Sequence, residues 1–191
     1  MSIRNNAMSY KRIPLAIFFI LGTSAALCQL NSNTASVALK ATLGESLTVA
    51  ATPSTVAIPL VSGGTATGTS PVAITTNWVL SASRTAVTLV GYFSSATAAL
   101  TDGAATPDNI PASEVLGQVT TGTPTSFTAF TQTAPLGAAG AGLTLFTQAL
   151  TETNRTANRT DNLNLEINLA GQPQLPAGTY TGTLNIQAQA L

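Results

Sequence analysis

The stretch Tyr180-Thr-Gly-Thr-Leu-Asn-Ile-Gln-Ala-Gln-Ala-Leu191 decides the fold class, because apolar and polar side chains alternate along it. A period of two is typical of a β-strand with one buried and one solvent-facing side. The turn-forming residues Pro176-Ala177-Gly178 separate this stretch from the preceding segment. The pattern therefore predicts that the chain ends in a strand of a sheet.

The same alternation recurs through much of the chain. From Ser36 to Ala51 the odd positions are apolar except Glu45, and Glu45 beside Gly44 predicts a bend or bulge between two strand pieces. Val72–Ala82 is the strongest central strand, with Trp78 on its apolar side. We further predict short strands at Thr55–Val61 and Val115–Thr120, and a hairpin that joins the central strand to Ala86–Ser94. Phe127–Gln132 and Leu143–Leu150 are predicted to be two paired strands. A polar loop at Thr151–Asp161 is then expected to precede a strand with one apolar side at Leu163–Leu169.

Downstream of residue 28 there is no sustained apolar stripe of helical period. About seven to nine strands, rich in Thr, Gly and Pro, predict an all-β fold, an antiparallel immunoglobulin-like β-sandwich. The length of residues 29–191 suits a single domain.

Residues 1–28 have the features of a cleaved secretory signal peptide. Arg4, Lys11 and Arg12 precede the uncharged apolar run Ile13–Leu27, and small residues follow near its end. An uncleaved anchor is the alternative, but the run is shorter than the roughly 20 residues that span a bilayer. Cleavage fits after Ala26 and also after Cys28. We therefore expect a secreted or cell-envelope protein, in the periplasm or on the cell surface, without a membrane span after cleavage.

Cys28 is the only cysteine. Lipidation is an open alternative, disfavoured because Leu27 is not the small residue that precedes a lipidated cysteine. If cleavage follows Cys28, the mature protein has no disulfide and depends on its core for stability.

The charge of the chain excludes a nucleic-acid partner. Removal of the leader takes three of the seven basic residues, so four remain against seven acids and the mature net charge is 4 − 7 = −3. No basic patch for phosphates remains. Only 7% of the residues are charged, far below the usual quarter, so the polar surface must be formed mainly by Thr, Ser, Asn and Gln.

The absence of histidine, with no cysteine behind the leader, excludes Ser-His-Asp and Cys-His catalysis and His- or Cys-based metal sites. We predict no enzyme activity and no cofactor, because few titratable groups remain to be tuned. Calcium at Asp102 and Asp108 is an alternative to their ordinary use in turns. A catalytic role would have to rest on the remaining carboxylates, with the candidates Asp102, Asp108, Glu114, Glu152 and Glu166.

Asn154 and Asn158 each begin an Asn-Arg-Thr sequon, which is either an N-glycosylation site or a chance match in a polar hairpin tip. Trp78, the only tryptophan, is expected to anchor the core. Its alternative role, as a stacking platform for sugar, would require an exposed face, against its register.

Three segments resemble bacterial envelope domains. Leu175-Pro-Ala-Gly-Thr-Tyr-Thr-Gly-Thr-Leu-Asn-Ile186 resembles the end of spore-coat-U-like (Csu-type) pilin domains and of WxL cell-wall-binding domains, and Ala35–Leu43 is similar to the first strand of the pilin-type domains. Asn77-Trp78-Val79-Leu80 fits a Trp-x-Leu motif. The cysteines of Csu-type subunits and the second Trp-x-Leu of WxL domains are absent. The resemblance implies an immunoglobulin-like secreted fold.

Two functions follow as hypotheses. The first is a structural or assembly subunit of the cell surface, of fimbrial type, in which Ser36–Leu43 completes the sheet of a neighbouring copy or envelope subunit by strand addition. Its rival is that this segment pairs within its own sandwich. The second is a binding module for cell-wall polysaccharide or another glycan, since hydroxyls and amides suit neutral ligands.

Overall fold

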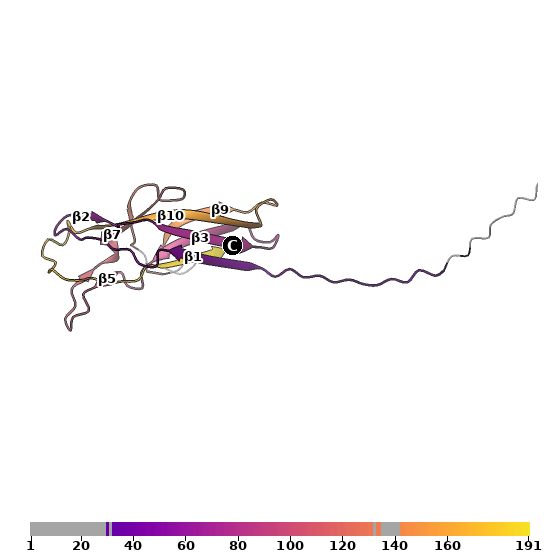
Figure 1. Ribbon diagram of the computed structural model, residues 1–191, viewed down its shortest axis with the longest axis horizontal. Coiled ribbons are helices and arrows are strands. Elements are labelled where there is room, and N and C mark those ends of the chain that lie inside the picture. Colours follow the sequence, from indigo (N-terminus) through magenta and orange to yellow (C-terminus); the bar gives the residue numbers. More distant parts are fainter. Residues whose placement is uncertain (1–29, 31, 132, 135–141) are drawn as a thin grey trace, which may run out of the picture. The chain divides into compact units, whose positions relative to one another are not determined.

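The computed structural model describes residues 30, 32–131, 133–134 and 142–191 (Figure 1). The predicted signal peptide, its cleavage sites and Cys28 lie outside the described residues. The described part is all-β apart from one short 3-10 helix, and its compact unit begins at Thr42 and runs to Leu191. Its elements are β1 (Ser46–Thr52), β2 (Thr65–Thr67), β3 (Val72–Val79), β4 (Ala86–Tyr92), β5 (Leu100–Thr101), β6 (Asn109–Ile110), η1 (Ala112–Glu114), β7 (Val115–Val119), β8 (Thr128–Ala129), β9 (Leu143–Ala149), β10 (Thr156–Asn168) and β11 (Asn185–Ala190).

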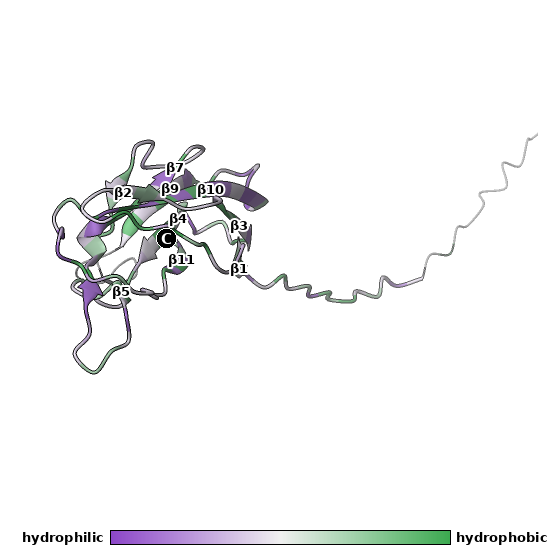
Figure 2. Cartoon of the chain, turned by 60° about the vertical axis from the view of Figure 1, so that its left-hand side comes forward, coloured by the Kyte–Doolittle hydropathy of each residue, from purple (hydrophilic) through white to green (hydrophobic). Residues whose placement is uncertain are grey.

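The strands form two main antiparallel sheets. The larger has six strands in the order β1-β3-β10-β7-β8, with β2 also paired to β10, and the smaller has the order β11-β4-β9. A separate two-stranded ribbon joins β5 to β6. Side chains from both main sheets meet in one apolar core, so the fold is β-sandwich-like. Figure 2 shows hydrophobic and hydrophilic residues along the same strands, as expected when one face is buried.

Phe130, which follows β8, fills the space between the sheets. It is fully buried, and its ring meets that of Phe93 edge to face with centroids 5.5 Å apart. Gly117 of β7 and Gly91 of β4 make this possible, because an added Cβ would lie only 2.8 and 3.0 Å from the Phe130 ring. The two glycines therefore allow the Phe130 ring to pack closely against β7 and β4.

Several sequence predictions are confirmed. β3, β4 and β7 occupy the predicted segments, and Trp78 lies in the core with 3% of its surface exposed. The C-terminal strand exists but begins only at Asn185; of the preceding residues, Thr181 forms a single bridge with Thr101. The one-sided strand Leu163–Leu169 corresponds to the second half of β10.

Other predictions were wrong. β3 and β4 do not form a hairpin, because the Ser81–Thr85 connection carries the chain from one sheet to the other. The strands around Phe127–Gln132 and Leu143–Leu150 are not paired, since β8 pairs with β7 and β9 with β4. Thr55–Val61 is not a strand. The predicted loop Thr151–Asp161 contains the first half of β10. The bend at Gly44-Glu45 is instead the start of regular structure, since the described residues before β1 belong to no strand.

Candidate functional site: an exposed arm and an apolar groove

Residues 32–45, which we call the N-terminal arm, contain no strand and are exposed throughout. The large apolar side chains of the arm remain in water: Val37, Leu39 and Leu43 are 81%, 93% and 84% exposed. They occupy odd positions, so an extended arm would present them on one side. Burial of one such side chain stabilises a protein by about 1.5–3 kcal/mol. The exposed side chains of the arm do not make this contribution.

A separate apolar groove opens within the compact unit. Its volume is about 280 Å³, and it lies between residues 51–58, at the end of β1 and after it, and residues 182–186, which lead into β11 and begin it. Val56 and Ile58 line one side, Leu184 and Ile186 the other, and the core side chains of Phe93 and Ile167 contribute to its lining. The groove therefore reaches the interior of the sandwich from the surface.

The two strands next to this groove each end a sheet. In the part of the chain that the structure describes, β1 pairs only with β3, and β11 pairs only with β4. β1 and β11 lie beside each other without forming a ladder. Each consequently has an edge whose backbone groups can accept another strand.

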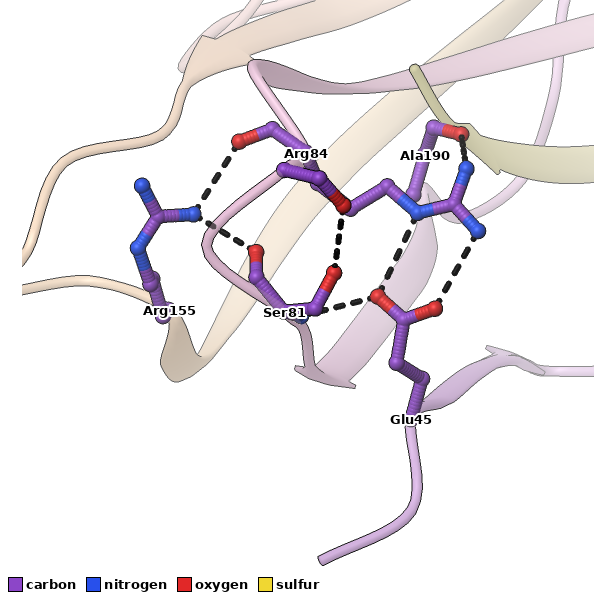
Figure 3. Close-up of polar contacts among 6 residues, drawn as sticks. Glu45, Ser81, Arg84, Arg155 and Ala190 are labelled. Carbon is purple, nitrogen blue, oxygen red and sulfur yellow. Dashed lines mark hydrogen bonds and ion pairs between the residues drawn. The ribbon is translucent and has the colours of Figure 1, made fainter.

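An ion-pair network surrounds Glu45, which immediately precedes β1 within the compact unit (Figure 3). The Glu45 carboxylate accepts hydrogen bonds from the Ser81 backbone N–H at 2.8 Å and from Arg84 Nε and Nη2 at 3.2 and 3.1 Å. Arg84 Nη1 donates to the carbonyl of Ala190 at the end of β11. Arg155 Nη1 donates to the carbonyls of Ser81 and Arg84. The network thus joins the start of β1, the turn after β3 and the end of β11.

Arg84 and Ser81 lower the pKa of Glu45 from its ordinary 4.5 to about 2, chiefly through these hydrogen bonds. A carboxylate with a lowered pKa in the folded state stabilises the fold above its unfolded pKa and loses this contribution as the pH falls. We expect the Glu45 contribution to be complete above about pH 4.5 and to be lost as the pH falls towards 2.

Glu45→Gln should therefore lose less stability on acidification than the wild type. The measurement is the unfolding temperature of both proteins between about pH 7 and pH 2, where the gap between them should narrow over the window set by the two pKa values. Glu152→Gln is the matched control, since Glu152 is exposed and has no hydrogen-bond or ion-pair partner among the described residues. If the difference in unfolding temperature between the wild type and Glu45→Gln is the same at every pH, protonation of Glu45 does not affect the stability of the fold.

The structure places the candidate carboxylates on separate elements. Asp102 and Asp108 lie at the β5–β6 ribbon, where Asp102 Oδ1 accepts the backbone N–H groups of Ala104 and Asp108. Glu114 ends η1, Glu152 lies in the loop after β9 and Glu166 is in β10. Within the described ranges, no group of three or more His, Cys, Asp or Glu side chains could hold a metal ion. Asp102 therefore has the bonding of a turn residue.

The two sequon asparagines differ in their surroundings. The Asn154 side chain is engaged, since Oδ1 accepts from the Thr151 N–H and Nδ2 donates to the Ala149 carbonyl. Asn158 is exposed on β10. Trp78 is buried and donates from Nε1 to the Asn154 carbonyl at 2.8 Å, so its ring is not an exposed platform.

Sequence reasoning missed a buried charge cluster. The Asp161 side chain is fully buried and accepts hydrogen bonds from Arg159 Nε and Nη2 at 2.6 and 2.8 Å and from Thr121 Oγ1 at 2.6 Å. The Arg159 guanidinium also lies 4.6 Å from the centre of the Phe146 ring. The only available signal was the spacing: opposite charges two residues apart share one face of a strand.

Comparison with family models, with curated proteins and with solved structures gives no match for this chain. Among the described residues, no helix has the length and apolar character needed to cross a membrane.

Proposed function

We propose that this protein is a non-catalytic, secreted or cell-surface structural subunit of fimbrial type that assembles by strand addition. The observation that carries the proposal is the coexistence of an arm whose large apolar side chains are exposed and an apolar groove that opens to the surface of the compact unit. In this proposal, residues 36–43 of one copy enter the groove of a second copy beside β1 and β11. The sandwich is then immunoglobulin-like, with one strand supplied from outside.

The chemistry of the two parts is complementary. An added strand gains affinity from main-chain hydrogen bonds to the free edges and specificity from alternate side chains that enter pockets. Val37, Leu39 and Leu43 are spaced to place apolar groups along the groove, while Lys40 stays on the polar side. Three buried apolar side chains supply several kcal/mol, from which the ordering of the arm must be subtracted.

Deletion of residues 29–43 should leave a folded monomer that does not assemble. Light scattering coupled to gel filtration measures the mass of the mature protein and of the deletion variant, and circular dichroism measures folding. The deletion variant should then bind a synthetic Ala35–Leu43 peptide and unfold at a higher temperature, whereas a peptide with Leu39→Asp should have little effect. The proposal fails if the deletion unfolds the domain, or if the mature protein remains monomeric at high concentration.

A further inference from the structure

A second cavity, of about 430 Å³, lies between the two sheets at β9 and the first half of β10. In the described part of the chain, β9 pairs only with β4, and residues 156–162 of β10 pair only with β3. The cavity is open to solvent, and its lining includes Gln148 of β9 and Ala157, Asn158 and Arg159 of β10. Its size lies within the range of about 300–1,000 Å³ typical of small-molecule sites.

Arg159 is the one charged residue among the described residues that line this cavity, and its guanidinium is held in place and paired with a carboxylate. Asp161 and the Thr121 carbonyl hold Nε and Nη2 of Arg159, and the guanidinium lies over Phe146. Arg159 Nη1 has no hydrogen-bond partner among the described residues. Because the Asp161 carboxylate cancels the charge, the cavity offers a rigid N–H donor with little net attraction for anions.

One side-chain amide, that of Gln148, adds an acceptor to this donor, whereas the side chains of Thr121 and Asn154, which also line the cavity, already have partners. Gln148 uses Nε2 for the Ala149 carbonyl, while its Oε1 is free in the described part of the structure. The Asn158 side chain lies on the outward face of β10, opposite to Arg159, so Asn158 contributes only its backbone to the lining. An amide both donates and accepts, as a sugar hydroxyl does. The Ala157 side chain and the edge of Trp78 add apolar surface beside these groups.

We propose that this cavity binds one sugar unit of a neutral polysaccharide. Paired donors and acceptors, a cancelled charge and a small apolar surface match a ring that carries hydroxyls and no ionised group. The inference goes beyond assembly, because the cavity shares no lining residue with the apolar groove. It assigns a ligand class to a surface that strand addition does not use.

The single tryptophan gives the experiment its readout, since Trp78 contributes to the lining. Mature protein is titrated with neutral oligosaccharides of glucose, mannose or galactose, and with an oligomer of galacturonic acid as the charged comparison. A saturable change in Trp78 emission is expected with at least one neutral oligomer. Gln148→Ala should weaken binding about three- to tenfold, the effect of losing one hydrogen bond.

Asn162→Ala is the matched control, because Asn162 is exposed on β10 but does not line the cavity. It should bind as the wild type does. The proposal is overturned if none of the neutral oligomers alters the emission, if the uronic acid oligomer binds more tightly than all of them, or if Asn162→Ala weakens binding as much as Gln148→Ala. Failure of assembly in the arm deletion would leave this result unaffected, since residues 29–43 do not line the cavity.

Discussion

Trp78→Ala should lower the free energy of unfolding by about 3–5 kcal/mol, the usual effect of emptying a large buried aromatic site. Trp78 is 3% exposed and packs in the core with Ile74 and other apolar side chains of both sheets. The substitution also leaves the Asn154 carbonyl without its Nε1 donor. A typical domain has only about 5–15 kcal/mol of stability, so much of it would be lost.

Chemical denaturation of the purified variant measures this loss, and the yield of folded protein should fall with it. Trp78→Phe is the control, because it keeps a packed ring and removes mainly the hydrogen bond, so it should cost clearly less. Native Trp78 emission in the wild type should be blue-shifted and move to longer wavelength on unfolding. Emission at the fully solvated position in the folded protein would contradict the observed burial.

The fold class could be predicted because alternation is a local property. Val72, Ile74 and Trp78 alternate with less buried residues along Val72–Val79, so the burial of Trp78 follows the period of the strand. Strand partners could not be predicted in the same way. The break at Ser83-Arg84-Thr85 has the composition of a hairpin turn, yet here it connects two different sheets. Local composition does not distinguish the two, since long-range packing decides between them.

Of the two parts of the candidate site, the arm could be predicted from the sequence and the groove could not. The arm could be found because its apolar residues alternate just behind the predicted leader. The groove could not, because Val56 and Leu184 lie far apart in the chain and meet only through the sheet order. The first half of β10 was missed since polar residues occupy both of its faces, and its inward side carries Arg159 and Asp161 where apolar residues are expected.

Asp161→Ala should also lower the free energy of unfolding by about 3–5 kcal/mol, the effect of removing one partner of a buried ion pair. The substitution leaves Arg159, whose side chain is 23% exposed, without its counter-charge between the sheets. It also leaves the Thr121 hydroxyl without its acceptor. Part of the Arg159 charge can be hydrated at the cavity, which places the expected loss towards the lower end of the range.

The double variant Arg159→Met with Asp161→Leu distinguishes the pair from ordinary packing. When both charges are replaced by apolar groups of similar size, no charge is left buried, so this variant should be more stable than Asp161→Ala alone. Denaturant unfolding of Arg159→Met, of Asp161→Leu and of the double variant measures the coupling between the two residues. If the single and double losses simply add, the ion pair contributes nothing of its own, and the rigidity that we assign to Arg159 in the polar cavity would lose its physical basis.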